Sequence, residues 1–103
     1  MIQSEKIMPY QSSTVVAEPD RQRIDKWLWH ARVVSTRGAA AALAASGHVR
    51  VNGARIDTPG RRVRAGDVIT VALERRVRVL KVGGFAERRG PTRTAQFLYE
   101  ELT

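Results

Sequence analysis

Basic side chains recur through residues 23–55 with a spacing that suits the binding of anions. They are Arg23, Lys26, Arg32, Arg37, Arg50 and Arg55. An Arg guanidinium can hold a phosphate through two parallel hydrogen bonds, whereas Lys acts as a point charge. The whole chain of 103 residues has 18 Lys and Arg against 10 Asp and Glu, a formal net charge of +8. Such a charge favours a polyanionic partner, either a nucleic acid or an anionic membrane surface.

Residues suited to catalysis or metal binding are sparse. His30 and His48 are the only histidines and cysteine is absent, so thiolate ligands and disulfides are excluded. The spacing suggests no Ser-His-Asp arrangement, and Gly83-Gly84 is typical of a turn rather than a phosphate loop. We expect no cofactor, no metal site and no enzymatic activity. No apolar run approaches the roughly 20 residues of a membrane span, and no signal peptide is evident, so we expect no membrane partner.

Two short helices are expected to position the basic residues. Asp25 is predicted as the N-cap of a helix over 26–32, and Ser35 or Thr36 as the cap of a second, alanine-rich helix. Gly47 stands where helices commonly stop in the left-handed conformation. The start of the second helix favours a phosphate, because its N–H groups are free and its dipole end is positive. For the hydroxyls of Ser35 and Thr36, helix capping is at least as well supported as contact with a ligand. For Arg37 we favour contact with a ligand.

A small antiparallel sheet is expected to follow the helices, which makes the fold class α+β. Valines alternate with polar residues from His48 onward, and Asn52-Gly53 is a strong signal for a type I′ hairpin over 49–56. Residues 68–73 form a nearly continuous apolar run, which predicts a central strand. Residues 74–82 alternate again and predict a further strand.

The two ends of the chain are interpreted as additions to one domain over residues 21–82. Residues 1–20 contain two prolines and little periodicity, which predicts a flexible N-terminal arm. Residues 83–103 form a C-terminal extension in which Thr92 or Thr94 would cap a short helix. The apolar face of that helix would comprise Ala95, Leu98, Tyr99 and Leu102.

The tryptophans and the remaining arginines can be assigned either to the structure or to ligand binding. Trp27 and Trp29 cannot share a helix face, so we expect one to be buried and the other partly exposed. Packing is favoured over base stacking for both rings. Arg88 and Arg89 are interpreted as a solvated pair, whereas Lys26, Arg32 and Arg37 are interpreted as ligand contacts.

The order of these motifs resembles the S4-type RNA-binding domain. The shared features span residues 21–73 and are Arg23-Ile24-Asp25-Lys26, Thr36-Arg37, Gly47-His48-Val49, Val51-Asn52-Gly53 and Val63-Arg64 with Gly66-Asp67-Val68-Ile69. The segment KWLWHAR at 26–32 is similar to the bacterial heat-shock protein 15 family, which are small ribosome-associated S4 proteins. Members of that family often continue into a longer basic C-terminal tail, whereas this sequence ends at Thr103.

The resemblance implies two short N-terminal helices packed on a small, mainly antiparallel sheet, with a C-terminal helix. It also implies a cytoplasmic, non-enzymatic protein of the stress response that binds structured RNA, namely large-subunit ribosomal RNA and tRNA. Its role would be the rescue of stalled large ribosomal subunits that carry nascent chain on tRNA, and a monomer is the default state. Carried over position by position, the RNA surface would use Arg23, Lys26, Arg32, Thr36, Arg37, Arg50, Asn52 and Arg55.

Two alternative functions are left open by the residues. Two helices with a short connector can mimic a helix-turn-helix, which predicts a DNA-binding regulator. Against this, the second helix is nearly all alanine and has no polar side chain to read base edges after Arg37. The other alternative is a partner-binding adaptor that uses the final helix and has only generic affinity for polyanions.

Overall fold

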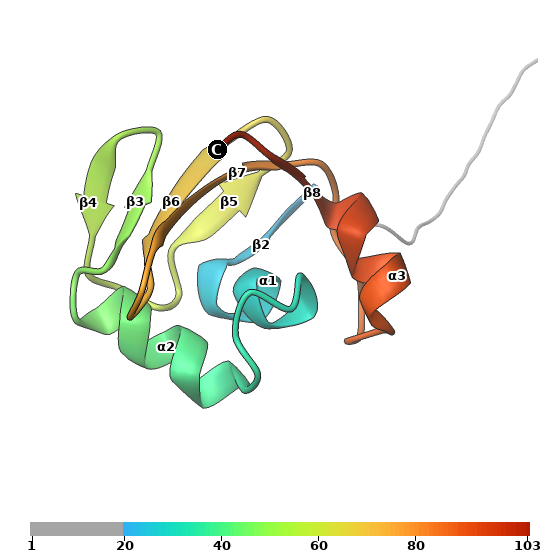
Figure 1. The fold of residues 1–103 in the computed structure, drawn as a ribbon, viewed down its shortest axis with the longest axis horizontal. Coiled ribbons are helices and arrows are strands. Elements are labelled where there is room, and N and C mark those ends of the chain that lie inside the picture. The colour runs from blue at the N-terminus through green and yellow to red at the C-terminus, as the bar shows by residue number, and fades with distance from the viewer. Residues whose placement is uncertain (1–19) are drawn as a thin grey trace, which may run out of the picture.

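The computed structural model describes residues 20–103, so the predicted arm lies almost wholly outside the described residues. Figure 1 shows helices gathered on one side of a curved sheet. The elements in chain order are β2 (Arg21–Arg23), α1 (Ile24–His30), α2 (Arg37–Ala45), β3 (Val49–Val51), β4 (Ala54–Ile56), β5 (Arg62–Arg64), β6 (Val68–Ala72), β7 (Val77–Val82), α3 (Thr92–Ala95), the 3-10 helix η1 (Gln96–Leu98) and β8 (Tyr99–Glu101). The predicted α+β class is confirmed.

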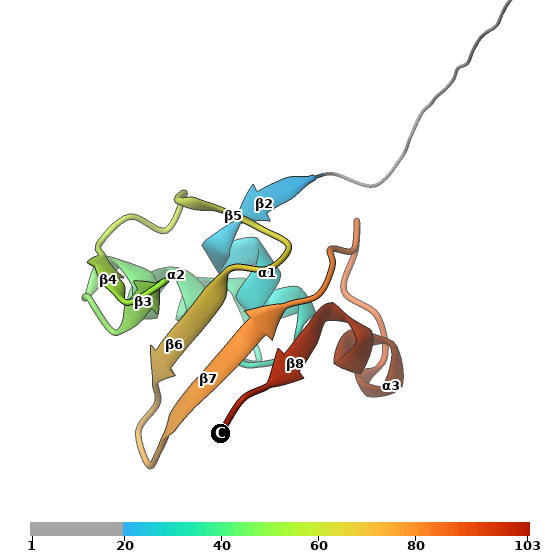
Figure 2. The ribbon, with the colours of Figure 1, turned by 90° about the horizontal axis from the view of Figure 1, so that it is seen from above.

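The strands form a five-stranded antiparallel sheet and a separate two-stranded ribbon. The sheet has the order β4-β3-β6-β7-β8, and β2 pairs with β5 to make the ribbon. Figure 2 shows the long β6–β7 hairpin extending away from α1 and α2. The ribbon was not predicted, because a three-residue strand such as β5 has no recognisable period of its own. Within residues 20–103, no helix combines the length and hydrophobicity needed to cross a bilayer.

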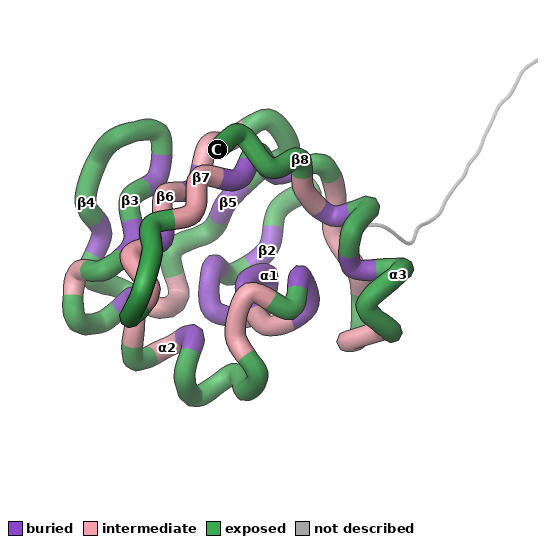
Figure 3. Tube along the Cα trace, viewed as in Figure 1, coloured by how far each residue is buried: buried purple, intermediate pink, exposed green. Residues whose placement is uncertain are grey.

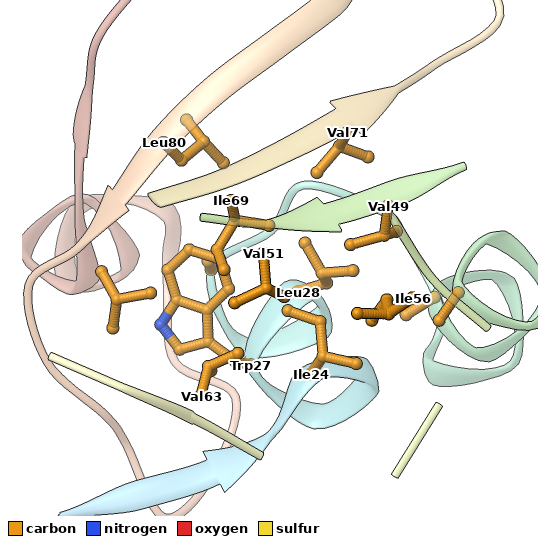
Figure 4. Close-up of a cluster of buried hydrophobic side chains, with 14 of the residues drawn as sticks. Ile24, Trp27, Leu28, Val49, Val51, Ile56, Val63, Ile69, Val71 and Leu80 are labelled. Carbon is orange, nitrogen blue, oxygen red and sulfur yellow. The ribbon is translucent and has the colours of Figure 1, made fainter. Parts of the chain in front are cut away.

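One hydrophobic core joins α1 and α2 to the inner face of the sheet. Ile24, Trp27 and Leu28 of α1 are completely buried, as are Ala40 and Ala44 of α2. Figure 4 shows the α1 side chains pointing toward valine, isoleucine and leucine side chains of β3, β6 and β7. In Figure 3 the buried positions concentrate in α1 and the strands around it. The alanines let α2 lie close to this core because they add little bulk.

The two tryptophans divide as predicted. Trp27 is completely buried, and its indole Nε1 donates to the carbonyl oxygen of Gly84 at 3.1 Å. Trp29 is half-buried at the edge of α1. The hydrogen bond of Trp27 satisfies the one polar atom that its burial would otherwise leave without a partner.

The start of α1 differs from the prediction. Arg23, not Asp25, is the N-cap residue, and it makes no side-chain capping bond. Backbone atoms take over this role, since Ile24 N donates to Arg61 O at 2.7 Å and Asp25 N to Pro59 O at 3.3 Å. The first two N–H groups of α1 are therefore capped by the chain around β5, and the third, that of Lys26, donates to Asp25 Oδ1.

Both main helices end with the same backbone arrangement. In α2 the terminating residue is Gly47, with a φ of +83° as predicted. In α1 the helix ends at His30 rather than Arg32, and Arg32 itself adopts a φ of +61°. Val33 N donates to Leu28 O at 3.0 Å across this turn. This is a Schellman motif with arginine at the position where glycine is usual.

The predicted hairpin over 49–56 is confirmed. Asn52 and Gly53 have φ values of +52° and +84°, as a type I′ turn requires. The Asn52 side chain also joins the turn to the next strand, because its Oδ1 accepts from Val68 N at 2.9 Å and its Nδ2 donates to Asp67 Oδ1 at 3.1 Å. The strand predicted from residue 74 begins later, at Val77, because Leu73 N donates to Arg76 O and closes a turn.

The C-terminal helix is present but shorter than its apolar pattern predicted. It covers Thr92–Ala95 and passes through η1 into β8, so Tyr99 and Leu102 do not lie on a helix. Tyr99 is paired with Val82 of β7, and Leu102 N donates to Val79 O at 2.8 Å. Pairing with the open edge of β7 gives residues 99–101 backbone hydrogen bonds in a sheet. This pairing is more stable than extending a short helix by a few residues.

Candidate nucleic-acid interface

A buried carboxylate orients two arginines at the junction of α1 and α2. Asp25 has a side chain only 4% exposed, and Arg23 binds it through Nε–Oδ1 at 3.2 Å and Nη2–Oδ2 at 3.0 Å. Arg37 Nη2 lies 3.7 Å from Oδ1 of the same carboxylate, the oxygen that also accepts from Arg23 Nε. The arginine side chains are 48% and 43% exposed. The carboxylate thus holds Arg23 through two hydrogen bonds and lies at ion-pair distance from Arg37. Both arginine side chains stay partly exposed, and one negative charge against two positive charges leaves a net positive charge.

Lys26 and His30 lie on the same helix as this carboxylate. Lys26 is half-buried, whereas His30 is only 1% exposed. Burial lowers the pKa of His30, and the positive charges of Lys26, Arg37 and Arg89 lower this pKa further. A hydrogen bond between Nδ1 and Ala86 O, at 2.9 Å, opposes that shift only in part. His30 is therefore neutral at pH 7, and its Nδ1–H donates to the carbonyl.

The start of α2 confirms one of the two predicted caps. Thr36 is the N-cap, and its Oγ1 accepts from Ala39 N at 3.0 Å. The hydroxyl hydrogen can still be donated, since an O–H group donates one bond and accepts others. Thr36 and Arg37 are both exposed, so a hydroxyl with a hydrogen to donate and a guanidinium both lie at the positive end of the α2 dipole.

Arg32 lies at the end of α1 and not within it. Its Nε donates to Gly90 O at 2.9 Å, which ties the end of α1 to the chain that follows β7. The residue is exposed, and the N–H groups of its two terminal nitrogens extend beyond this bond.

The predicted residues of the hairpin form a second basic group. Arg50 and Arg55 face each other across β3 and β4. Arg55 passes so close to Gly47 that a Cβ there would lie 2.5 Å from its Nε. Arg55 therefore stands at the C-terminal end of α2 and Arg37 at its start. The nine residues of α2 separate these ends by about 13 Å, at about 1.5 Å per residue.

The prediction of a solvated Arg88-Arg89 pair is wrong for Arg89. Arg88 is exposed, but Arg89 is half-buried and donates from Nε to Trp29 O at 3.1 Å. Its Nη2 donates to Val34 O at 3.5 Å, and its guanidinium carbon lies 5.9 Å from the centre of the Trp29 ring. These partners lie 55 and 60 residues away in the sequence, so no local pattern could have predicted the contacts.

The described geometry defines an S4 protein, and comparison with known proteins supports this. The S4 domain family matches residues 22–69. A heat shock protein 15 homolog of Aeromonas salmonicida is 46% identical over 82 residues, which cover 77% of this chain and 59% of that protein. The small ribosomal subunit protein uS4 of Rhodopseudomonas palustris (strain TIE-1) is 40% identical over 72 residues, covering 68% of this chain and 35% of uS4.

A solved structure extends the similarity beyond the S4 segment. The trimeric structure of Vibrio cholerae heat shock protein 15 has a TM-score of 0.73 and 33% sequence identity, covering 79% of this chain and 81% of that chain. The chain belongs to the heat shock protein 15 family of S4-domain proteins. It spans about three fifths, 59%, of the length of the first heat shock protein 15 relatives that it matches.

Proposed function

We propose that this protein binds structured RNA without catalysing a reaction, and that it does so mainly through the junction of α1 and α2. The observation that carries the proposal is that the buried carboxylate of Asp25 binds Arg23 through two hydrogen bonds and forms an ion pair with Arg37. Guanidinium groups held in place lose little side-chain freedom when a phosphate binds. We group Arg23, Lys26, Thr36 and Arg37 as the junction cluster.

RNA is the polyanion that this surface suits best. Helical RNA is recognised mainly through its shape, its phosphates and its 2′-hydroxyls, which a rigid basic surface can contact. The alanines of α2 offer no groups to read base edges, which argues against a sequence-specific DNA regulator. The adaptor alternative needed an amphipathic final helix, but α3 ends at Ala95 and Tyr99 belongs to β8.

The hairpin and the end of α1 complete the proposed surface. Arg32, Arg50 and Arg55 are exposed and would contact phosphates beyond the junction cluster. We leave Asn52 out of this surface, because both ends of its amide are bonded to Asp67 and Val68 within the fold.

We further propose ribosomal RNA of the large subunit as the target, including subunits that carry nascent chain on tRNA, in the cytoplasm. The family membership supports a ribosomal target, and so does the similarity to uS4. A rescue role and a monomeric working state remain parts of this proposal, although the Vibrio cholerae relative forms a trimer.

The test is a salt titration of binding to purified large ribosomal subunits, with small subunits and duplex DNA as competitors. We expect large subunits to bind most tightly, and DNA to displace the protein poorly. Arg37→Gln should reduce the slope of log affinity against log salt by about one. Arg75→Gln is the matched control, since it removes the same charge from the exposed β6–β7 turn. Equal displacement by duplex DNA would reject RNA as the preferred partner.

A further inference from the structure

The segment after β7, residues 83–91, lies against α1 and is held there by side chains. We call this segment the strap. Trp27 Nε1 donates to Gly84 O at 3.1 Å, and Gln22 Nε2 donates to Ala86 O at 2.9 Å. His30 Nδ1 donates to the same Ala86 oxygen, and Arg32 binds Gly90 O. The strap is thus fixed along its length by β2, α1 and the residue that ends α1.

Arg89 is the strap residue that reaches back toward the helices. Its Nε–H and one Nη2–H are directed at the carbonyl oxygens of Trp29 and Val34. Its guanidinium also lies over the Trp29 ring, a position in which the charge is attracted to the ring face. These three contacts hold the side chain in one orientation against the end of α1 and the connector to α2.

The guanidinium of Arg89 retains binding capacity and charge after these contacts. A guanidinium has five N–H donors, and two of them are used here, which leaves three. Within residues 20–103, Arg89 has no carboxylate at ion-pair distance, whereas Arg23 and Arg37 share Asp25 and Arg78 binds Glu101. Backbone carbonyls orient the group without neutralising it. Among residues 20–103, Arg89 is therefore a positioned cation without a carboxylate partner.

The location of Arg89 connects it to the junction cluster. The connector that it contacts at Val34 leads directly to Thr36 and Arg37. The charges of Lys26, Arg37 and Arg89 also act together on His30, which lies between α1 and the strap. Arg89 thus contacts the connector that leads into α2 and, together with two residues of the junction cluster, adds to the positive potential at His30.

We propose that Arg89 is a further RNA-binding residue, which presents a preoriented fork to one phosphate at the edge of the junction cluster. The proposal rests on the proposed RNA-binding function and extends its surface beyond the S4 segment matched at residues 22–69. The competing interpretation is that Arg89 only fastens the strap to α1.

The experiment compares Arg89→Gln, Arg89→Lys and Arg75→Gln with the unaltered full chain, using large-subunit ribosomal RNA and a range of salt concentrations. Arg89→Gln should weaken binding about tenfold and lower the salt slope by about one. Arg89→Lys should keep the slope, because the charge remains, but bind more weakly, because the fork is lost. Arg75→Gln should leave affinity nearly unchanged at the same net charge.

Several outcomes separate the two interpretations. If Arg89→Gln melts at a lower temperature but binds with the slope and affinity of the unaltered chain, Arg89 is only a fastening and the inference is overturned. If Arg89→Gln does not fold, Arg89→Lys provides the test. An affinity of Arg89→Lys for RNA equal to that of the unaltered chain would overturn the proposal that the Arg89 guanidinium binds a phosphate as a fork. If Arg37→Gln also leaves the slope unchanged, the proposed function itself fails. If Arg37→Gln lowers the slope and Arg89→Gln does not, only this inference fails.

Discussion

Oδ1 of Asp25 lies 3.7 Å from Nη2 of Arg37, so a carboxylate in the first turn of α1 reaches the first residue of α2. The same carboxylate accepts two bonds from Arg23 and one from the backbone N of Lys26 at 2.7 Å. Asp25 therefore links the start of α1 to the start of α2 and holds the side chain of Arg23 beside them. This role in positioning basic residues explains why the negatively charged Asp25 lies within the proposed RNA surface.

Asp25→Asn should destabilise the fold and loosen the junction cluster. The amide keeps the shape but loses the charge that holds two guanidinium groups, and we expect a cost of about 1–3 kcal/mol in the free energy of unfolding. Urea denaturation measures this cost. Asp57→Asn is the matched control, because Asp57 is exposed and, within residues 20–103, its carboxylate accepts a hydrogen bond from Thr58 alone. Equal stability of the two variants would contradict the role assigned to Asp25.

Substitutions of Arg32 should separate backbone strain from RNA contact. The φ of +61° costs an L-residue about 1–2 kcal/mol, which glycine avoids. Arg32→Gly should thus be more stable than Arg32→Ala by about 1 kcal/mol, although both lose the bond to Gly90. Both should weaken RNA binding equally, since both lack the guanidinium. Urea denaturation and RNA titration test the two parts, and a less stable Arg32→Gly would refute the strain argument.

Stability should depend on pH through His30. Its folded-state pKa is lowered below 6.5, so the unfolded chain binds more protons when the pH falls below that value. The free energy of unfolding should therefore be highest above pH 6.5 and decrease as the pH falls through 6.5 toward the folded-state pKa. His30→Gln should reduce this dependence in denaturation experiments between pH 7 and pH 5. His48→Gln is the control with the other histidine replaced, and it should keep the dependence.

Asn52 should matter for folding and not for RNA contact. Asn52→Ala removes the acceptor for Val68 N and the donor to Asp67, and it places alanine at a φ of +52°. We expect a loss of about 1–3 kcal/mol in stability. RNA affinity, measured at a temperature where the variant is folded, should change less than twofold. A tenfold loss of affinity in the folded variant would return Asn52 to the RNA surface.

Features set by a few neighbouring residues could be predicted from the sequence. The stop at Gly47, the turn at Asn52-Gly53 and the cap at Thr36 each follow from the backbone preference or side-chain chemistry of the residues involved. The basic character of the α1–α2 junction was also visible, since Lys26 and Arg37 lie on or next to predicted helices.

Features set by distant partners could not be predicted. The cap of α1 comes from the backbone around Pro59 and Arg61, which replaced the side chain of Asp25 in that role. Tyr99 lies in a strand because the edge of β7 was open, and no local pattern reports an open edge. Arg89 contacts Trp29 only because the strap lies against α1. In each case the missing information was tertiary.

The hydrogen bond from Trp27 to Gly84 has a consequence for how this module can be moved between proteins. The sequence shared across S4 proteins covers residues 22–69, but the buried indole of Trp27 within it depends on a carbonyl that lies 15 residues beyond the end of that segment. A chimera cut at the edge of the shared sequence would carry a core tryptophan without its acceptor and a sheet without β7. The segment shared across S4 proteins is thus shorter than the segment that this core requires, and grafts should extend at least to Gly84.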